Sequence, residues 1–392
     1  MHVVHLSLGF ARATDANAFL DRIPALTRLC EETARLPEAR VTALCRFDRA
    51  ADVQRNGVDY HFRVDDPRHL LAGRRTYPRS LFRLARELRP DVVHVHGLLF
   101  PIQVAELRLW LGRGPVLVVQ HHGERPEGRM RPWLQQLLFR AADGFLFTAS
   151  GIADEWIRAG VLGPSWPVHG VVEASTDFLP APRAEARERT GLPGSPAVLW
   201  VGRLHGKKDP MTALEGFARA LEHLPGAHLS MVFREAPLFS DVQAFRERSP
   251  HLAERVHLLG EVLHADLASR LSAADLFLTS SPAEGSNFAL IEALACGTPP
   301  VASDIPAHRV LTGNGAVGKL FDVGDAESCA RALVALASGL SDEAGIAARR
   351  HFEESLAWPA VARQAVRAYE SLASEKPDVP DVRGSSGPPR RA

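Results

Sequence analysis

Lysine is scarce in this sequence, and neither sign of charge is in excess. Only four of the 46 basic residues are lysine, two of them the adjacent Lys207 and Lys208, and the others are arginine. The 46 acidic residues balance these cations, so the formal net charge is zero. A nucleic-acid-binding protein usually carries a basic excess, and the balance argues against that class. The four cysteines form no C-x-x-C pair, so the sequence indicates no zinc knuckle and fits a reducing compartment.

Long hydrophobic runs and a P-loop motif are also missing. No apolar run approaches the roughly 18 residues that a membrane span needs. The opening HVVHLSLGF has neither a basic segment nor a cleavage site, so we expect no signal peptide and a cytoplasmic protein. No G-x-x-x-x-G-K-[ST] occurs, and the basic stretch 201–210 holds no G-x-G-x-x-G, so neither a P-loop nor a dinucleotide fingerprint explains that stretch. No D-x-D occurs either, and we predict no metal site and no cofactor.

Strand-like and helix-like segments alternate over most of the chain. The apolar runs lack strict alternation, which is typical of strands buried on both faces. Strands are predicted over residues 2–8, 39–47, 91–97, 115–123, 144–150, 197–204, 228–233, 255–260, 275–280 and 299–304. Helical patterns separate them over residues 16–36, 78–89, 130–142, 210–223, 264–273, 287–296 and 325–338. This alternation predicts an α/β protein with parallel, doubly wound sheets.

The alternation occurs twice, which predicts two Rossmann-like domains that face a cleft. The N-terminal domain is placed at 1–172, and the Pro- and Ala-rich stretch 173–196 is interpreted as a linker. The C-terminal domain is placed at 197–350, and a helix follows at 351–373. The tail 374–392 has almost nothing to bury and is expected to be disordered. Ligands of open α/β sheets bind beyond the carboxyl ends of the strands, so the loops after strands are the places to search.

The loop VGRLHGKKDP, residues 201–210, has the composition of an anion site. Asp209 is a suitable N-cap and Pro210 a suitable first helical residue, so a helix is expected to begin there. Backbone N–H groups, the helix dipole and fixed cations would together favour a diphosphate. The ligand candidates are Gly202, Arg203, Lys207 and Lys208. A solvated basic turn is the alternative interpretation of this loop.

The segment SSPAEGSNFALIEALACG, residues 280–297, follows another predicted strand and holds two acids without a basic residue. Glu284 falls in a loop, and Glu292 falls in a helix that ends at Gly297. Carboxylates accept hydrogen bonds from vicinal hydroxyls such as those of sugars, so we predict hydroxyls as the partners of both acids. Small side chains and free N–H groups would let a ligand approach the backbone at Gly285, Ser286, Asn287, Phe288 and Ala289. The alternative interpretation is that neither acid binds a ligand: Glu284 would lie at a helix N-terminus, and Glu292 would be a solvated helix residue.

These motifs together resemble glycosyltransferase family 4, whose members are retaining enzymes with the GT-B fold. The spacing of Glu284 and Glu292 resembles the family's E-x7-E signature, and VGRLHGKKDP is similar to its VGRL…KG loop. DVVHVHG and VVQHHG look like N-domain strands of the family. Residues 352–372 are similar to its closing helix, which in the family crosses back onto the N-domain. The resemblance covers roughly residues 1–373.

The resemblance implies a function and a role for each candidate residue. The expected enzyme is a retaining glycosyltransferase that moves a glycosyl group from a nucleotide-diphosphate sugar to an acceptor hydroxyl on a glycan, lipid-linked molecule or small molecule. Arg203 and Lys208 would hold the diphosphate and neutralise the leaving group without a metal. Glu284 would contact the donor sugar, Glu292 the ribose, and His122 would line the donor-sugar site. The other donor-binding candidates are Gly202, Gly285, Ser286, Asn287, Phe288 and Ala289.

Several positions depart from the family pattern. SN follows the first acid of the signature at residues 286–287, Asp209 stands where a glycine is usual, and EASTD at 173–177 replaces the interdomain PNGVD. The N-terminal glycine pair is reduced to Gly9, the one candidate on the acceptor side. Two alternatives therefore stay open: a GT-B sugar-nucleotide epimerase, and a non-catalytic sugar-nucleotide-binding partner of another transferase.

Two further features have both a structural and a functional interpretation. Four histidines lie near the ends of two neighbouring strands: His94, His96, His121 and His122. Structural roles are expected rather than metal binding, with an active-site role for His122 as the alternative. Residues 68–89 hold seven arginines and an apolar stripe at helical spacing. They are interpreted as an ordinary domain helix, with peripheral contact to an anionic membrane as the alternative. The sequence does not identify the nucleotide base, sugar, acceptor or oligomeric state.

Overall fold

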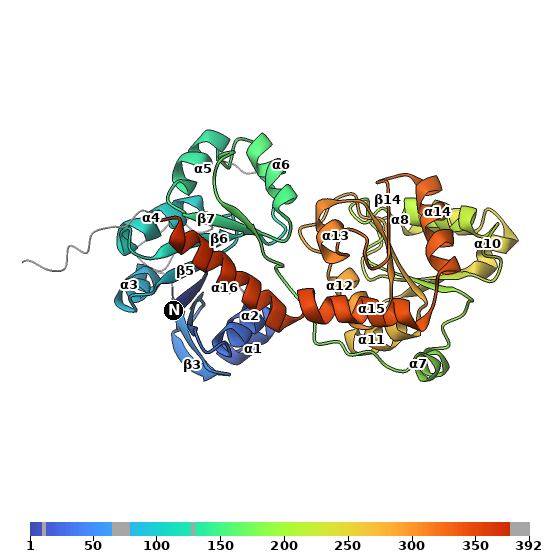
Figure 1. Ribbon diagram of the computed structural model, residues 1–392, viewed down its shortest axis with the longest axis horizontal. Helices are drawn as coiled ribbons and strands as arrows, with labels where there is room; N and C mark the ends of the chain where they lie inside the picture. The colour runs from blue at the N-terminus through green and yellow to red at the C-terminus, as the bar shows by residue number, and fades with distance from the viewer. Residues whose placement is uncertain (10–12, 65–78, 127–129, 377–392) are drawn as a thin grey trace, which may run out of the picture.

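The computed structural model describes residues 1–9, 13–64, 79–126 and 130–376, which form two α/β domains lying side by side (Figure 1). Residues 68–78 of the arginine-rich segment and residues 377–392 of the predicted tail lie outside the described residues. Among those described, no helix combines the length and the apolar character of a membrane span. The two parallel sheets confirm the predicted fold class.

The N-terminal domain is built on an eight-stranded sheet in the order β3-β4-β2-β1-β5-β6-β7-β8, parallel throughout except between β3 and β4. Its strands are β1 (His2–Ser7), β2 (Arg40–Arg46), β3 (Ala51–Arg55), β4 (Val58–Arg63), β5 (Val92–His96), β6 (Val116–Gln120), β7 (Gly144–Phe147) and β8 (Val168–Gly170). Its helices are α1 (Ala16–Arg22), α2 (Pro24–Ala34), α3 (Arg79–Glu87), α4 (Pro101–Leu111), α5 (Pro132–Phe139) and α6 (Ala153–Arg158), with a 3-10 turn at Ser150–Ile152.

Some elements of this domain differ from the prediction for a physical reason. The helix expected over 16–36 is two helices, because Pro24 starts a new helix as its first residue. The prediction omits the antiparallel strands β3 and β4 because they form no continuous apolar run, although their alternating residues around Asn56–Gly57 are a hairpin signal. The strand β8 is only three residues long, too short for a periodic signal.

The C-terminal domain is built on a six-stranded parallel sheet in the order β11-β10-β9-β12-β13-β14. Its strands are β9 (Ala197–Val201), β10 (His228–Val232), β11 (Val256–Gly260), β12 (Leu276–Thr279), β13 (Pro300–Ser303) and β14 (Lys319–Phe321). Its helices are α7 (Arg183–Thr190), α8 (Pro210–Ala220), α9 (Phe239–Arg246), α10 (Pro250–Arg255), α11 (His264–Ala273), α12 (Phe288–Ala295), α13 (Pro306–Leu311), α14 (Ala326–Ser338) and α15 (Asp342–His351). A π-helical turn at Phe352–Leu356 leads into the last helix, α16 (Trp358–Ser374).

The order of these strands places the two sequence motifs next to each other. From β9 the chain proceeds outward to β11 on one side of the sheet and then crosses to β12 on the other side. The loops that follow β9 and β12 therefore flank the topological switch point, where open α/β sheets bind ligands. They carry residues 202–209 and 280–287, the two segments singled out in the sequence.

The stretch interpreted as a linker is folded over its second half. Helix α7 packs against α11. Arg187 of α7 donates a hydrogen bond to the carbonyl oxygen of Ala273 (2.7 Å) and pairs with the Asp275 carboxylate (2.5 Å). At the other end of the stretch, Asp177 forms an ion pair with Arg28 of α2. Residues 173–196 are thus attached to both domains rather than loosely connecting them.

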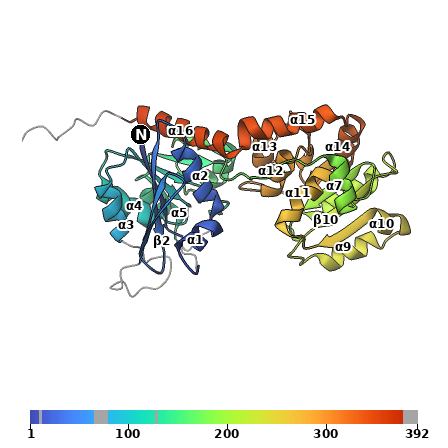
Figure 2. The same cartoon turned by 90° about the horizontal axis from the view of Figure 1, so that it is seen from below.

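Helix α16 ties the end of the chain to the N-terminal domain. It packs against α2, β6 and β8, and together with α15 it runs along one edge of both domains (Figure 2). The hydroxyl group of Tyr369 lies 2.7 Å from Nδ1 of His94 on β5. Leu372 lies so close to Gly144 that a Cβ atom at that glycine would stand 2.5 Å from its side chain. One hydrophobic cluster consequently includes residues of both sheets and of α16.

We expect the substitution L372A to destabilise the protein by about 2–5 kcal/mol, because Leu372 is 1% exposed and its loss leaves a cavity over the N-terminal sheet. Equilibrium urea unfolding measures the change. The matched control is L109A, since Leu109 on α4 is 84% exposed and should lose no more than about 0.5 kcal/mol. Equal losses in the two variants would show that the contact of α16 does not stabilise the domain.

Candidate functional site

A cleft of about 480 Å³ lies between the two domains and is lined by residues of the loops that follow β6, β9 and β12. All but one of the predicted site residues line it: His122, Gly202, Arg203, Lys207, Lys208, Glu284, Gly285, Ser286, Asn287, Phe288, Ala289 and Glu292. The exception is Gly9, which is exposed and is not among the lining residues. The structure thus brings the candidates together, while their individual roles remain predictions.

The loop after β9 is fixed in shape by Asp209, and this shape positions Lys208. Asp209 adopts a left-handed conformation (φ 42°), which asparagine and aspartate tolerate better than most residues. Its side chain caps α8 by accepting hydrogen bonds from Thr212, as the sequence predicts. The hydroxyl group of Ser280 donates to the carbonyl oxygens of Lys208 (3.1 Å) and Asp209 (2.6 Å). The loops after β9 and β12 are therefore linked directly behind the Lys208 side chain.

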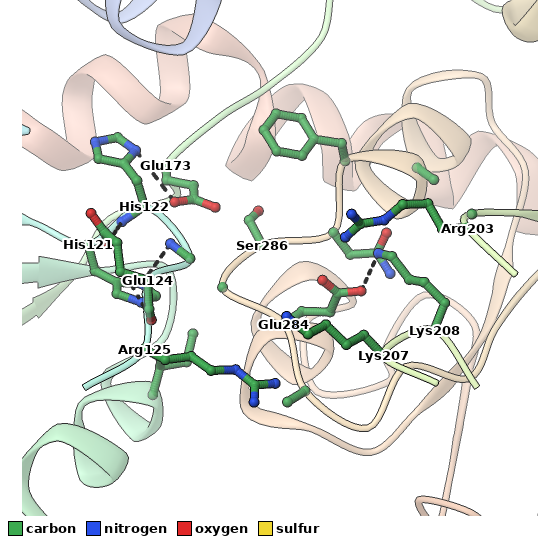
Figure 3. Close-up of a pocket in the computed structure, with 18 of the residues that line it drawn as sticks. His121, His122, Glu124, Arg125, Glu173, Arg203, Lys207, Lys208, Glu284 and Ser286 are labelled. Carbon is green, nitrogen blue, oxygen red and sulfur yellow. Dashed lines mark hydrogen bonds and ion pairs between the residues drawn. The ribbon is translucent and has the colours of Figure 1, made fainter. Parts of the chain in front are cut away.

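Lys208 and Glu284 form an ion pair across the two loops. This pairing corrects the expectation that Glu284 has only hydroxyls as partners. The ammonium and carboxylate groups lie in the half-buried wall of the cleft, where Figure 3 shows them facing its interior. Arg203 is more exposed, with its guanidinium 3.6 Å from the carboxylate of Glu235 at the rim. A ligand bound against this wall would contact Lys208, which Glu284 already orients, and Arg203 at the rim.

Asn287 begins helix α12, and its side chain serves the scaffold. Its Oδ1 accepts a hydrogen bond from the Leu290 N–H group (3.3 Å), and its Nδ2 donates to Thr279 (3.1 Å) and to the ring of His308 (3.0 Å). Burial lowers the pKa of His308 to about 4, so this ring is neutral and can accept the bond through Nε2. The Asn287 side chain is thus already engaged. What α12 offers the cleft is the N–H groups of Phe288 and Ala289, which precede its first internal hydrogen bond.

Glu292 also has a basic partner, contrary to the expectation from the sequence. Its Oε1 accepts a hydrogen bond from Nε2 of His264 (2.9 Å), the first residue of α11. The ring of His264 packs on Phe178 with 4.7 Å between the ring centroids. Burial raises the pKa of Glu292, and the bond from His264 acts in the opposite direction. Glu292 is therefore a desolvated carboxyl group held by one exposed imidazole at the edge of the cleft.

The N-terminal wall of the cleft is a tight turn at residues 121–124. The carboxylate of Glu124 accepts hydrogen bonds from the N–H groups of His122 (2.6 Å) and Leu98 (3.1 Å), and Gly123 has a positive φ of 73°. Gly285 touches this turn, since a Cβ atom at Gly285 would lie 2.6 Å from Cα of Gly123. Only a residue without a side chain lets the two domains meet here.

Several residues that line the cleft are not among the predicted ones. Glu124, Arg125 and Glu173 join it from the N-terminal side. The sequence gives no signal for these three residues, because each becomes a site residue only through the folding of a turn or of the interdomain segment.

Three buried histidines lie close enough together to be considered as metal ligands. His5, His94 and His96 each bring one ring nitrogen to within 4.8 Å of the others. The rings of His94 and His96 are stacked, with 4.3 Å between centroids and an interplanar angle of 14°. Their in-plane lone pairs therefore lie in nearly parallel planes and do not converge on one point, as metal coordination requires. This arrangement does not fit a metal ion.

Two family profiles match the chain. The profile of the Glycosyl transferase 4-like domain matches residues 24–171, and that of Glycosyl transferases group 1 matches residues 195–339. A similar protein is the phosphatidyl-myo-inositol mannosyltransferase of Mycobacterium leprae, 28% identical over 297 residues, which are 72% of this chain and 74% of that protein. Another is the D-inositol 3-phosphate glycosyltransferase of Rhodococcus erythropolis, 31% identical over 206 residues, or 50% of this chain and 46% of that protein.

Solved structures share the two-domain architecture. Sucrose-phosphate synthase from Thermosynechococcus elongatus superposes with a TM-score of 0.63 at 21% identity, over 96% of this chain and 100% of that chain. Anabaena HepE in complex with UDP superposes with a TM-score of 0.67 at 17% identity, over 95% of this chain and 100% of that one. At such identities the likeness establishes a common fold.

The buried carboxyl group of Glu292 generates a prediction for the free protein. Because its pKa is raised, the folded state keeps this proton to a higher pH than the unfolded state. Its contribution to stability therefore falls as the pH rises from the ordinary carboxyl range through the raised pKa. E292Q keeps the acceptor for His264 and removes the charge, so we expect it to be more stable than the wild type at about pH 8.

This stability difference should shrink as the pH falls toward about 4, where Glu292 is protonated in both states. Thermal unfolding of both proteins across this pH range measures it. Titrating groups that do not contact Glu292 are shared by the two proteins and cancel, and H264Q in both backgrounds removes the contribution of His264. A difference that stays constant with pH would show that the carboxyl group does not titrate differently on folding.

Proposed function

The chain belongs to the group 1 glycosyl transferases, glycosyltransferase family 4, and on this premise we propose how its site holds a donor and which acceptor it uses. It is a glycosyltransferase that transfers a sugar from a nucleotide sugar to an acceptor. We propose that transfer proceeds with retention of configuration. The donor would lie in the cleft between the sheets, across the loops after β9 and β12.

The observation that carries the donor assignment is the Lys208–Glu284 pair beside the N-terminus of α12. Breaking a glycosyl–diphosphate bond places negative charge on the leaving phosphate. Lys208, with Arg203 at the rim, and the N–H groups of Phe288 and Ala289 would stabilise that charge where it develops. When the diphosphate engages Lys208, the carboxylate of Glu284 becomes available to a hydroxyl of the donor sugar.

Glu292 would bind the ribose of the donor. Two vicinal hydroxyls can donate to one carboxylate, and the buried Glu292 would gain hydrogen bonds that only His264 supplies in the free protein. Ser286 is also poised for the donor, because its hydroxyl group is buried at the cleft and has no hydrogen-bond partner among the described residues. Asn287 would contribute through its position at the start of α12 rather than through its side chain.

For the acceptor we propose an inositol ring that carries a phosphate, either free or as the headgroup of a lipid. Two groups of similar proteins support this choice, since one is named for phosphatidyl-myo-inositol and the other for D-inositol 3-phosphate. Arg125 is exposed on the N-terminal wall of the cleft and could pair with such a phosphate. If the acceptor is a lipid, the protein would work at a membrane surface.

A binding panel tests this proposal before any acceptor is known. Thermal unfolding is recorded with UDP-, GDP- and ADP-sugars, and the true donor should raise the melting temperature by mass action. The best donor is then incubated alone, with inositol phosphate and with vesicles containing phosphatidylinositol. Transfer to either inositol compound supports the acceptor assignment. Isomerisation of the donor alone would identify an epimerase, and stabilisation by none of the donors would overturn the proposed function.

We expect K208A to lower transfer by about two to three orders of magnitude, because a fixed cation that meets developing charge is worth that much in comparable sites. Initial rates with saturating donor measure the loss. Stability should change by no more than about 1 kcal/mol, since the Lys208–Glu284 pair is partly exposed to water. The control K319A removes an exposed lysine of β14 and should retain full activity. Wild-type rates in K208A would contradict the assignment of the diphosphate site.

A further inference from the structure

Three histidines connect the interior of the N-terminal sheet to the cleft and end at a carboxylate. His5 Nδ1 lies 3.0 Å from His96 Nε2, and His96 Nδ1 lies 2.9 Å from His122 Nε2. His122 Nδ1 in turn lies 3.5 Å from Oε2 of Glu173. Figure 3 shows the two side chains facing each other. His5 lies on β1 and His96 on β5, whereas His122 and Glu173 line the cleft. We call His5, His96 and His122 the histidine chain.

The two inner members of the histidine chain are neutral. Burial lowers the pKa of His5 to about 3, and burial together with the neighbouring imidazoles lowers the pKa of His96 well below its ordinary value. A neutral imidazole has one N–H group and one lone pair. Each inner ring can therefore donate on one side only and must accept on the other.

When His122 is neutral as well, this constraint allows two arrangements of protons. In the first, His5 donates to His96, His96 donates to His122, and His122 carries its own proton on Nδ1, toward Glu173. In the second, every bond is reversed, so that His5 carries a proton on Nε2 and His122 points a lone pair at Glu173. Nε2 of His5 is buried and has no partner among the described residues.

The first arrangement is favoured at both ends of the histidine chain. At the inner end it leaves His5 with an unpaired acceptor, whereas the second leaves an unpaired buried donor, which proteins avoid more strictly. At the outer end it turns an N–H group of His122 toward the Glu173 carboxylate at 3.5 Å, whereas the second turns a lone pair toward that negative charge. The interior of the sheet thereby directs the proton of His122 toward the cleft.

Glu173 is unusual for a residue of an interdomain segment. It is buried, it lines the cleft, and its Oε2 has no hydrogen bond to any described residue. It also begins EASTD, where the family pattern has the proline of PNGVD. A carboxylate offers about four acceptor sites, and His122 can occupy only one of them. The remaining sites are suited to hydroxyl donors, which both a sugar and an inositol present.

We propose that Glu173 binds a hydroxyl group of a substrate in the cleft, and that His96 is a positioning residue that keeps the proton of His122 directed at Glu173. The proposal rests on the proposed function for the identity of the hydroxyl, which belongs either to the donor sugar or to the acceptor. It goes beyond that function by giving a role to Glu173 of the interdomain segment and to His96, which does not line the cleft.

The first test is E173Q, with D154N as the control because Asp154 is exposed on α6 and does not line the cleft. A hydrogen bond to a charged group is worth roughly a ten- to hundred-fold change in affinity. The bare nucleoside diphosphate should bind E173Q and the wild type equally. If E173Q binds the sugar nucleotide more weakly than the wild type does, the hydroxyl belongs to the donor. If only the KM for the acceptor rises, the hydroxyl belongs to the acceptor. If neither changes while the wild type binds its donor, the role of Glu173 is overturned.

The second test reads the tautomer of His122 in the ligand-free protein by ¹⁵N NMR, so its outcome does not depend on the donor or on activity. The wild type should carry the proton on Nδ1. H96N should preserve this state, because its amide nitrogen can replace the donor Nδ1 of His96, whereas H96L should lose it. With the substrates, H96N should also retain more of the wild-type kcat/KM than H96L. A proton on Nε2 in the wild type, or zinc bound stoichiometrically by the buried histidines, would overturn the positioning role.

Discussion

The contact of α16 with the N-terminal sheet is the constraint on which the cleft depends. The chain completes its second domain at β14 and α14, and α15 and α16 then lead back to the first. Tyr369 pairs with His94 on β5, and Leu372 occupies the space over Gly144 on β7. Because the helix is buried against strands of one domain and its cluster continues into the other, the two sets of strand ends face the same cleft. Without this return, the linker segment alone would have to set their separation.

Both acids of the signature have a basic partner in the free cleft. Lys208 pairs with Glu284, and His264 pairs with Glu292. Neither carboxyl group of the signature therefore lacks a basic partner before a ligand binds. Burying an unpaired charge is costly, and each partner reduces that cost before a ligand arrives. A donor would exchange these partners, giving Lys208 a phosphate and giving the carboxylates hydroxyl groups. The pairs therefore keep the side chains oriented without blocking their use.

The departures from the family pattern have separate structural explanations. Asp209 can replace glycine because it tolerates the left-handed conformation and also caps α8. The side chain of Asn287 holds the start of α12 against His308 and Thr279, whereas Ser286 keeps a free hydroxyl group at the cleft. In EASTD, Asp177 binds Arg28 of α2, and Glu173 faces His122. Each residue that departs from the family motif thus makes its own specific contacts in the fold.

The sequence alone determined the two parallel sheets and the loops that carry the site, because apolar periodicity and helix caps are local signals. It also located the acids of the signature and the lysine pair. The prediction missed β3, β4 and the break of the first helix at Pro24, although each has a local signal: alternating residues around Asn56–Gly57, and the proline itself.

The partners of the site residues were decided only by the tertiary structure. Lys208 and Glu284 are 76 residues apart, and their pairing follows from the crossing of the chain between β9 and β12. His5 and His96 are 91 residues apart and meet because β1 and β5 are neighbours in the sheet. Glu173 reaches His122 only where the interdomain segment leaves β8. Hydrogen bonds and ion pairs act over a few ångströms in space, and sequence separation carries no record of which groups the sheet order brings within that range.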